Sequence, residues 1–200
     1  MTSSSVFDRR PILVALAGPN GAGKTSFYGA HLSPAGLRLV NADALARALD
    51  VSAYEAAAVA AKLREALVQQ HESFVFETVF SDPVGDKRAF LQRATAAGYT
   101  VVLVFIGLAS AELSEERVAM RVLQGGHDVP SDKLKSRFGR TLENLRHAIR
   151  ELPHVLVLDN SDLAHPFRKV AEFEGGKPVE LSAPLPRWVP WRGRRPVRER

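Results

Sequence analysis

The stretch most suited to chemistry is Gly18–Phe27, GPNGAGKTSF, near the start of the chain. It matches the pattern G-x-x-x-x-G-K-[ST] at every fixed position, and an apolar run of strand length, Ile12–Ala17, precedes it. Glycines let the backbone N–H groups of such a loop face phosphate oxygens, and the helix that follows adds its positive end. We predict a nucleoside triphosphate site in which Lys24 contacts the β- and γ-phosphates and Thr25 binds Mg²⁺. The loop residues expected to contact the nucleotide are Gly18, Pro19, Asn20, Gly21, Ala22, Gly23, Lys24, Thr25 and Ser26.

Polar residues follow two further strand-like runs, LRLV and FVFET. Ligands of an open α/β sheet bind beyond the carboxyl ends of its strands, so these residues are candidates for the reaction. We predict that Asp43 accepts the proton of a substrate hydroxyl, and that Asn41, Glu77 and Thr78 bind the acceptor. The other functional role open to Glu77 and Thr78 is to hold metal-bound water. The alternative for Asp43 is a cap on the helix that follows it. The alternative for Glu77 and Thr78 is that they satisfy a loop.

Four arginines on two expected helices form a second candidate group. Arg117 and Arg121 are one helical turn apart, and Arg137 and Arg140 flank the apolar stripe of the next helix, beyond the turn GGHDVP. We predict a lid that clamps the triphosphate when it closes, with Arg121 and Arg137 as catalytic residues and Arg117 and Arg140 as nucleotide contacts. The alternative is that these arginines are solvated. His127, in the turn, is expected to be structural.

Composition and charge limit the classes of protein to consider. A chain of 200 residues suits one domain, and the absence of cysteine excludes disulfides, zinc thiolates and thiol chemistry. The net charge of +5 equals that of residues 187–200, which hold six arginines and one glutamate. Contact with nucleic acid is therefore expected only through this tail, which is otherwise a disordered or surface-wrapped terminus. The apolar runs are too short to span a bilayer and no secretory signal is evident, so we expect a cytoplasmic protein without membrane contact.

Strand-like and helix-like segments alternate up to about residue 160, which indicates an α/β fold with a mostly parallel sheet flanked by helices. We predict a five-stranded core over residues 12–162 and, outside that sheet, a small C-terminal hairpin over residues 167–181 that turns at Gly175-Gly176. Together they make one domain, residues 1–182, followed by a tail rich in proline, tryptophan and arginine, residues 183–200. The expected strands are Ile12–Ala17, Leu37–Asp43, Phe74–Thr78, Tyr99–Leu108 and His154–Asp159, and the expected helices start near Lys24 and cover about 53–70, 86–97, 111–124 and 131–152.

The ordered segments GPNGAGKTSF, VNAD, FVFET, RVAMRVLQGGHDVP and DNS resemble the zeta-toxin-like P-loop kinases over roughly residues 12–162. The resemblance implies a P-loop NTPase core of the kinase type and ATP-dependent phosphorylation of a sugar hydroxyl. In zeta toxins the acceptor is UDP-N-acetylglucosamine, and a cognate antitoxin blocks the nucleotide site. The residues that match the family's functional positions by motif are the base Asp43, the phosphate- and Mg²⁺-binding Lys24 and Thr25, the acceptor-binding Glu77, and the nucleotide-contacting Arg121 and Arg137.

The function expected is therefore transfer of the γ-phosphate of ATP to a hydroxyl of a small molecule. A UDP-N-acetyl-sugar is the candidate acceptor, and an antitoxin or inhibitor protein is a candidate partner. The alternative is a P-loop ATPase or switch that acts through a protein or nucleic-acid partner. LQGGH and VLVLDNS have a weak likeness to ABC-type ATPases, but Gln124 replaces the signature serine and Asn160 stands where hydrolysis needs a carboxylate. The segment LDNSD is expected instead to form an adenine-side loop or an Asx turn.

Overall fold

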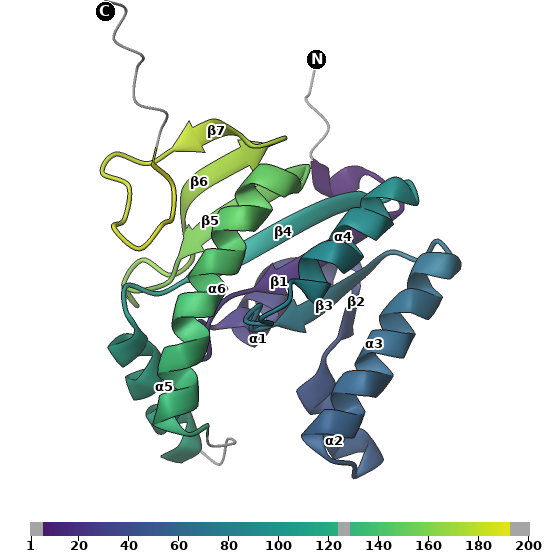
Figure 1. Ribbon diagram of the computed structural model, residues 1–200, viewed down its shortest axis with the longest axis horizontal. Coiled ribbons are helices and arrows are strands. Elements are labelled where there is room, and N and C mark those ends of the chain that lie inside the picture. The colour runs from purple at the N-terminus through teal and green to yellow at the C-terminus, as the bar shows by residue number, and fades with distance from the viewer. Residues whose placement is uncertain (1–5, 124–128, 193–200) are drawn as a thin grey trace, which may run out of the picture.

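The computed structural model describes residues 6–123 and 129–192, and it has a twisted sheet with helices on both faces (Figure 1). The strands are β1 (Ile12–Ala17), β2 (Arg38–Val40), β3 (Phe74–Thr78), β4 (Thr100–Gly107), β5 (His154–Asp159), β6 (Arg168–Glu174) and β7 (Lys177–Leu181). The helices are α1 (Lys24–Phe27), α2 (Ala42–Leu49), α3 (Ala53–Gln69), α4 (Asp86–Ala96), α5 (Ala111–Leu123) and α6 (Ser131–Glu151). A π-helical turn, η2 (Tyr28–Leu32), continues α1, and short 3-10 helices lie at η1 (Val6–Asp8) and η3 (Ser33–Ala35).

The α/β fold predicted from the sequence is confirmed, but the sheet is larger than expected. Its order is β2-β3-β1-β4-β5-β6-β7, with β1 to β5 paired in parallel and β6 and β7 antiparallel. The predicted hairpin does turn at Gly175 and Gly176, where both φ angles are positive. It pairs with β5, so it extends the main sheet instead of lying outside it. This pairing satisfies the edge of β5, which would otherwise present unpaired backbone groups.

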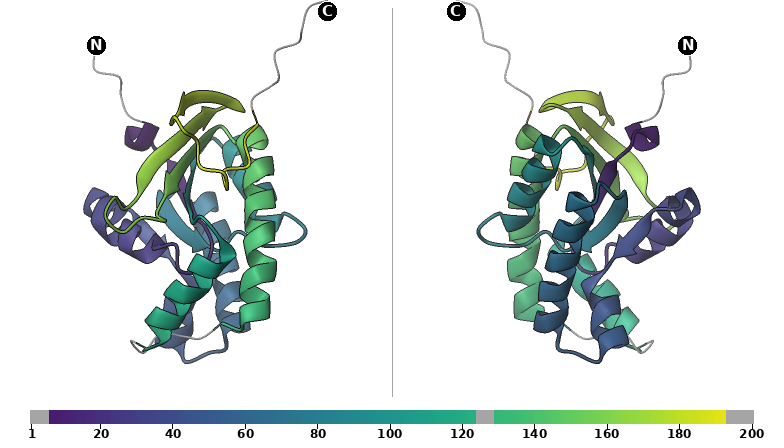
Figure 2. Two further views of the ribbon diagram at one scale, coloured as in Figure 1. Left: turned by 90° about the vertical axis from the view of Figure 1, so that its left-hand side faces the viewer. Right: turned by 90° about the vertical axis from the view of Figure 1, so that its right-hand side faces the viewer.

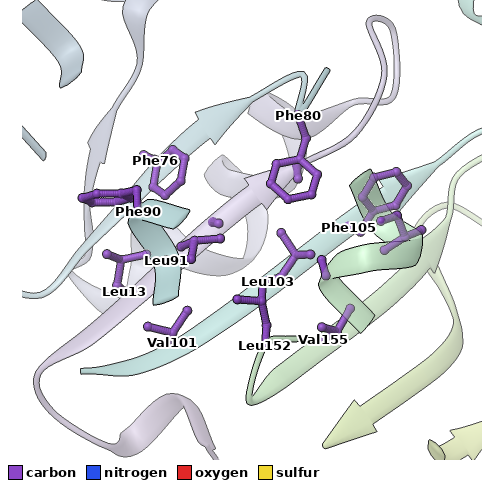
Figure 3. Close-up of a cluster of buried hydrophobic side chains, with 14 of the residues drawn as sticks. Leu13, Phe76, Phe80, Phe90, Leu91, Val101, Leu103, Phe105, Leu152 and Val155 are labelled. Atoms are coloured by element: carbon purple, nitrogen blue, oxygen red, sulfur yellow. The ribbon is translucent and has the colours of Figure 1, made fainter. Parts of the chain in front are cut away.

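Two apolar clusters hold the helices on the two faces of the sheet. Successive side chains of a strand point to opposite faces, so Leu13 and Ala15 lie in one cluster while Ile12 and Val14 lie in the other. The first cluster joins the sheet to α3, α4 and α6, and Figure 3 shows its aromatic and aliphatic side chains between these layers. The second cluster joins the other face to the region of α1 and η2. Burial on both faces explains why β1 and β4 read as continuous apolar runs.

The parallel register brings the functional loops to one edge of the sheet. Ala17, at the end of β1, lies opposite Thr78 of β3 and Phe105 of β4. Gly107 lies opposite Asp159, which ends β5. The chain places β2 and β3 on one side of β1, and β4 and β5 on the other. A reversal of strand order of this kind leaves a crevice beyond the carboxyl ends of the strands, where ligands bind.

The segment after β7 packs on the domain as far as the structure describes it, to residue 192, which agrees with the surface-wrapped form of the terminus and not with the disordered one. Val189 is buried, and Leu185, Trp188 and Trp191 pack against the first cluster. A Cβ on Gly107 would lie 2.1 Å from the indole ring of Trp188, so only glycine leaves room for this ring beside the end of β4. Figure 2 shows this yellow segment against α6. Two tryptophans supply enough apolar area to hold a proline-rich segment on the surface.

The apolar stripe of α6 faces the sheet as its helical spacing predicts. Leu134, Leu145 and Ile149 are buried, while the opposite face of the helix is exposed. Within the part of the chain that the structure describes, no helix is both long and apolar enough to cross a bilayer.

Candidate active site

The loop between β1 and α1 has the backbone geometry that a phosphate-binding loop requires. Gly18, Gly21 and Gly23 have φ angles of 145°, 73° and 85°, a region that favours glycine. A Cβ on Gly18 would lie 2.1 Å from the carbonyl oxygen of Ile106, so the close approach of this loop to β4 also needs glycine. Helix α1 begins at Lys24, directly after the loop. The loop predicted from the motif is therefore present with its expected strand and helix.

Lys24 is buried between the loop and the end of β3. Its exposed fraction is 7%, and its Nζ donates hydrogen bonds to the carbonyl oxygens of Gly18 and Pro19, both at 3.0 Å. Burial lowers the pKa of Lys24, and the charge of Arg121 acts in the same direction, whereas Glu77 and Asp43 raise it. The structure thus brings the charges of three other predicted site residues near the ammonium group of Lys24.

Glu77, at the end of β3, connects the loop to the second strand. Its Oε2 accepts hydrogen bonds from Thr25 Oγ1 at 3.0 Å and from Asn41 Nδ2 at 2.9 Å, and its Oε1 lies 3.9 Å from Lys24 Nζ. The four residues come from three different strand ends or loops, so the sheet register determines their meeting. Glu77 therefore lies at the centre of the predicted site rather than serving only its own loop.

Asp43 lies in the first turn of α2, and the structure excludes it as the cap of that helix. The N-cap is Asn41, whose Oδ1 accepts a hydrogen bond from the backbone N–H of Ala44 at 2.9 Å. Asp43 is exposed, and it accepts no hydrogen bond from the residues that the structure describes. Asp43 also lines a cavity that reaches Lys24 and Glu77. Its carboxylate is therefore available to a ligand in that cavity.

This cavity, which we call the acceptor cavity, has a volume of about 230 Å³. It is lined by Lys24, Asn41, Asp43, Glu77, Thr78 and Lys87, and by Ala57, Ala60 and Arg64 of α3 together with Ala42 and Val79. Thr78 lies here as predicted, but its hydroxyl accepts a hydrogen bond from the backbone N–H of Phe80 at 2.9 Å, so it is committed to the turn after β3. Sequence reasoning missed Arg64 and Lys87, because neither stands at a strand end or in a motif.

A second cavity, which we call the nucleotide cavity, lies beyond the phosphate-binding loop and has a volume of about 660 Å³. Gly21, Gly23 and Ser26 line one part of it, and Arg117 and Arg121 of α5 line another. The apolar part of the lining is formed by Leu113, Met120, Leu163, Pro166 and Phe167, and Glu116, Asn160 and Ser161 complete it. Pockets of about 300–1,000 Å³ with apolar walls and a few polar groups are typical of small-molecule sites. The size and lining suit a nucleotide.

Asn160, which follows β5, hydrogen-bonds to the phosphate-binding loop. Only part of its role was predicted from the sequence. Asn160 is buried; its Nδ2 donates a hydrogen bond to the carbonyl oxygen of Ala22 at 2.9 Å, and its Oδ1 accepts one from the N–H of Phe167 at 3.3 Å. The N–H and hydroxyl of Ser161 both donate to Asp159 Oδ1, which is the predicted Asx turn. The Asx turn predicted for LDNSD is therefore present, and Asn160 and Ser161 also line the nucleotide cavity. The adenine-side role of this loop stays a prediction.

A family model described as Zeta toxin matches residues 38–169, which is more than half of the chain. The chain belongs to the Zeta toxin family. The match begins after the phosphate-binding loop, so the loop is supported separately by its motif and its geometry. No curated protein matches the chain.

Solved structures of two systems share the fold of this zeta-toxin family member. An AvrRxo1-ORF1:-ORF2 complex has a TM-score of 0.71 at 20% identity, covering 92% of this chain and 64% of that one. The same complex with ATP has a TM-score of 0.69 at 22% identity, covering 90% and 64%. The PezAT toxin–antitoxin system of Streptococcus pneumoniae has a TM-score of 0.58 at 18% identity, covering 78% and 69%. The chain spans less than two thirds of the length of the AvrRxo1 chains, and these likenesses confirm the P-loop kinase type of α/β fold.

The four predicted lid arginines divide into two pairs in this zeta-toxin family chain. Arg117 and Arg121 line the nucleotide cavity, and Arg117 Nη2 donates to the carbonyl oxygen of Ser161 at 3.2 Å. Arg137 and Arg140 line a different cavity of about 400 Å³ beside the segment after β3, where Arg140 Nε donates to the carbonyl oxygen of Ser81 at 3.0 Å. The structure therefore does not bring all four together. The turn between α5 and α6, with His127, lies outside the described residues.

The residues around Thr25 fit a magnesium ion that is also held by a nucleotide. Thr25 Oγ1 and Glu77 Oε2 lie 3.0 Å apart beside the phosphate-binding loop, and both are oxygens of the kind that Mg²⁺ binds in proteins. Within residues 6–123 and 129–192, no group of three or more histidine or acidic side chains could hold a metal by itself. Mg²⁺ commonly takes one or two protein oxygens and completes its shell with water and substrate phosphates. The donor set is consistent with that mode of binding.

Proposed function

We propose that this chain transfers the γ-phosphate of ATP to a hydroxyl group of a small molecule. The observation that carries the proposal is that neighbouring residues of the phosphate-binding loop and of α1 line two different cavities, Gly23 and Ser26 one of them and Lys24 the other. The nucleotide cavity lies on the side of Gly23 and Ser26, and the acceptor cavity contains Lys24, Glu77 and Asp43. An ATPase needs room only for water beside the γ-phosphate, whereas a kinase needs a second site for the molecule that receives it. The acceptor cavity supplies such a site.

Asp43 is proposed as the general base of the transfer. The acceptor hydroxyl gives its proton to the carboxylate of Asp43 while its oxygen forms a bond to the γ-phosphorus. The bond from this phosphorus to the β,γ-bridging oxygen breaks, and ADP leaves with that oxygen. Asp43 is suited to this step because Asn41 caps α2 in its place and leaves the carboxylate exposed to the cavity.

Charge neutralisation is assigned to residues on both sides of the loop. Lys24 would exchange its two carbonyl partners for oxygens of the β- and γ-phosphates, and Arg117 and Arg121 would hold the phosphates from α5. Thr25, with Glu77 beside it, would hold Mg²⁺ against the same phosphates. The metal, when bound, neutralises charge that develops on the phosphate oxygens. Arg137 and Arg140 lie nearer the acceptor cavity, with which their own cavity shares Lys87, and are proposed to act on that side.

The test is whether ATP is consumed only when an acceptor is present. Purified protein with ATP and Mg²⁺ is incubated alone and with a set of sugars, UDP-sugars and other metabolites that carry hydroxyl groups. The proposal predicts slow hydrolysis alone, and fast ADP formation with a phosphorylated product for at least one acceptor. UDP-N-acetyl-sugars are the first acceptors to try, because the chain belongs to the Zeta toxin family. Fast ATP hydrolysis that no acceptor changes would favour the ATPase or switch instead.

An inhibitory partner is also proposed. PezAT is a toxin–antitoxin system, and AvrRxo1-ORF1 forms a complex with AvrRxo1-ORF2, so relatives of this fold work beside a second protein. Expression of this chain alone in bacteria is predicted to slow growth, and expression of the Asp43→Asn variant at the same level is predicted not to. Equal growth with both chains would argue against a toxic activity.

A further inference from the structure

Arg64 stands out among the charged residues of α3 because it faces the interior. Its exposed fraction is 8%, on the same helix face as the buried Ala60 and Leu67. Its guanidinium group lies over the rings of Phe76, 5.0 Å from the centroid, and Phe90, 5.5 Å from the centroid. Arginine is seldom buried to this extent unless it is paired, so its position needs an explanation.

No anionic partner for Arg64 occurs in the part of the chain that the structure describes. Its buried Nε has no hydrogen-bond partner there, and none of its other N–H groups donates a hydrogen bond. The neighbouring carboxylate of Glu65 is an ion-pair partner of Arg93 at 2.7 Å. Burial lowers the pKa of Arg64, and the charge of Glu65 acts in the opposite direction. The two aromatic rings offset only part of the cost of burying a cation without an acceptor.

The open side of Arg64 is the acceptor cavity. Ala57 and Ala60 line the cavity next to it, and these short side chains leave room in front of the guanidinium group. Lys87 of α4 lines the same cavity. With Lys24, three cations therefore line a space that also contains Asp43 and Glu77, the two acidic residues of the site. Guanidinium groups bind phosphate and carboxylate groups through paired N–H donors, and the N–H donors of Arg64 are the groups that lack an acceptor here.

We propose that Arg64 and Lys87 form a subsite for an anionic group, a phosphate or a carboxylate, on the acceptor molecule. The subsite rests on the proposed function only in that its ligand is taken to be the phosphate acceptor. It selects acceptors that carry a negative charge in addition to the hydroxyl, and it positions them with that charge at α3 and α4. Neutral sugars would lack this anchor and be poor substrates.

The first test measures binding of simple anions and does not need turnover. The full chain is saturated with Mg²⁺ and the β,γ-imido analogue of ATP, so that the phosphate positions of the loop are filled. Inorganic phosphate and, in a second arm, acetate are then titrated by calorimetry at constant ionic strength; the two arms separate the two anion types. We expect phosphate, acetate or both to bind the wild type at millimolar concentration, and Arg64→Met to weaken that binding by about 10- to 100-fold.

The matched control is Arg93→Met, since Arg93 also lies over Phe90, at 5.9 Å, but its side chain is 61% exposed and does not line the acceptor cavity. It should bind the anions as the wild type does. Arg64→Lys keeps the charge and should recover part of the anion affinity. Its comparison with Arg64→Met separates loss of the anion contact from loss of the fold. Equal anion affinity in wild type and Arg64→Met, or no anion binding by the wild type, would overturn the subsite.

The second test separates the subsite from the phosphotransfer itself. For any acceptor found, kcat/KM is compared with that of its neutral analogue; Arg64→Met should reduce the preference for the anionic form mainly by raising KM. Anion binding that depends on Arg64 without any phosphotransfer would leave the subsite standing and remove the proposed kinase. Phosphotransfer with equal kcat/KM for both acceptors would remove the subsite and leave the kinase.

Discussion

Asn160 donates its side-chain amide to the carbonyl oxygen of Ala22 at 2.9 Å, across 138 positions of sequence. The bond ties the end of β5 to the middle of the phosphate-binding loop. A Cβ on Gly23 would lie 2.8 Å from the same amide nitrogen, so the glycine and the asparagine fit each other. The loop is therefore shaped by the neighbouring strand end as well as by its own glycines.

Asn160→Ala is expected to destabilise the protein and to weaken ATP binding. The variant leaves the buried carbonyl of Ala22 without its donor, which costs about 1–3 kcal/mol of the free energy of unfolding. Denaturant titration and ATP affinity are the measurements, with Ser161→Ala as a control for stability alone, since its hydroxyl bonds to Asp159 and not to the phosphate-binding loop. Unchanged stability and affinity in Asn160→Ala would show that the loop does not depend on this bond.

Lys24→Met is expected to lower turnover by about 100-fold or more, because it removes the loop's only point charge on the transferred phosphate. The fold should survive. The lowered pKa of Lys24 means that the unfolded chain holds the proton more tightly than the folded one. The buried charge therefore costs stability at neutral pH, and the cost disappears as pH rises towards 10.5. The stability of Lys24→Met relative to wild type should fall over that alkaline range; a constant difference would contradict the assignment.

Glu77→Gln is expected to raise the Mg²⁺ concentration needed for half-maximal turnover. The substitution keeps the size of the side chain but removes the charge that faces Thr25 and Lys24. A Mg²⁺ titration of acceptor-dependent turnover measures the effect, with Thr25→Val as the paired variant that removes the hydroxyl. If both variants need no more Mg²⁺ than the wild type, the metal is held elsewhere.

The two pairs of arginines are expected to act on different substrates. Arg121→Met should raise the KM for ATP by about 10-fold, because Arg121 lines the nucleotide cavity. Arg140→Met should leave the KM for ATP within about two-fold of the wild type and raise the KM for the acceptor, since Arg140 lies beside the segment after β3. Steady-state kinetics with each substrate varied in turn distinguishes the two. An equal rise in the KM for ATP in both variants would support the single closing lid predicted from the sequence.

The fold was largely predictable because periodicity and turn residues indicate elements directly. β3 and β5 have the predicted bounds, and α6 buries the predicted stripe. The pairing of the hairpin with β5 and the packing of Trp188 on the first cluster were not predicted, because edge pairing and surface packing depend on residues distant in the sequence. The phosphate-binding loop was predictable because the residues that form it are consecutive in the sequence and match a known motif.

The rest of the site was less visible in the sequence. Asn41 and Asp43 are both good N-cap residues, so VNAD alone cannot say which one caps α2, and the observed helix start decides it. The helical spacing places Arg64 on the same face of α3 as the buried alanines. A charged residue at such a position does not by itself predict that its side chain lines a cavity.

The measurement that tests the account most directly is acceptor-dependent turnover of Asp43→Asn, together with its ATP affinity and melting temperature. Asparagine keeps the size of the side chain but cannot accept the proton. We predict a melting temperature close to that of the wild type, because Asn41 and not Asp43 caps α2, and unchanged ATP affinity, because the loop is untouched. Turnover should fall by about 10²- to 10⁴-fold, the usual contribution of a general base. Turnover close to that of the wild type would contradict Asp43 as the base and with it the proposed mechanism.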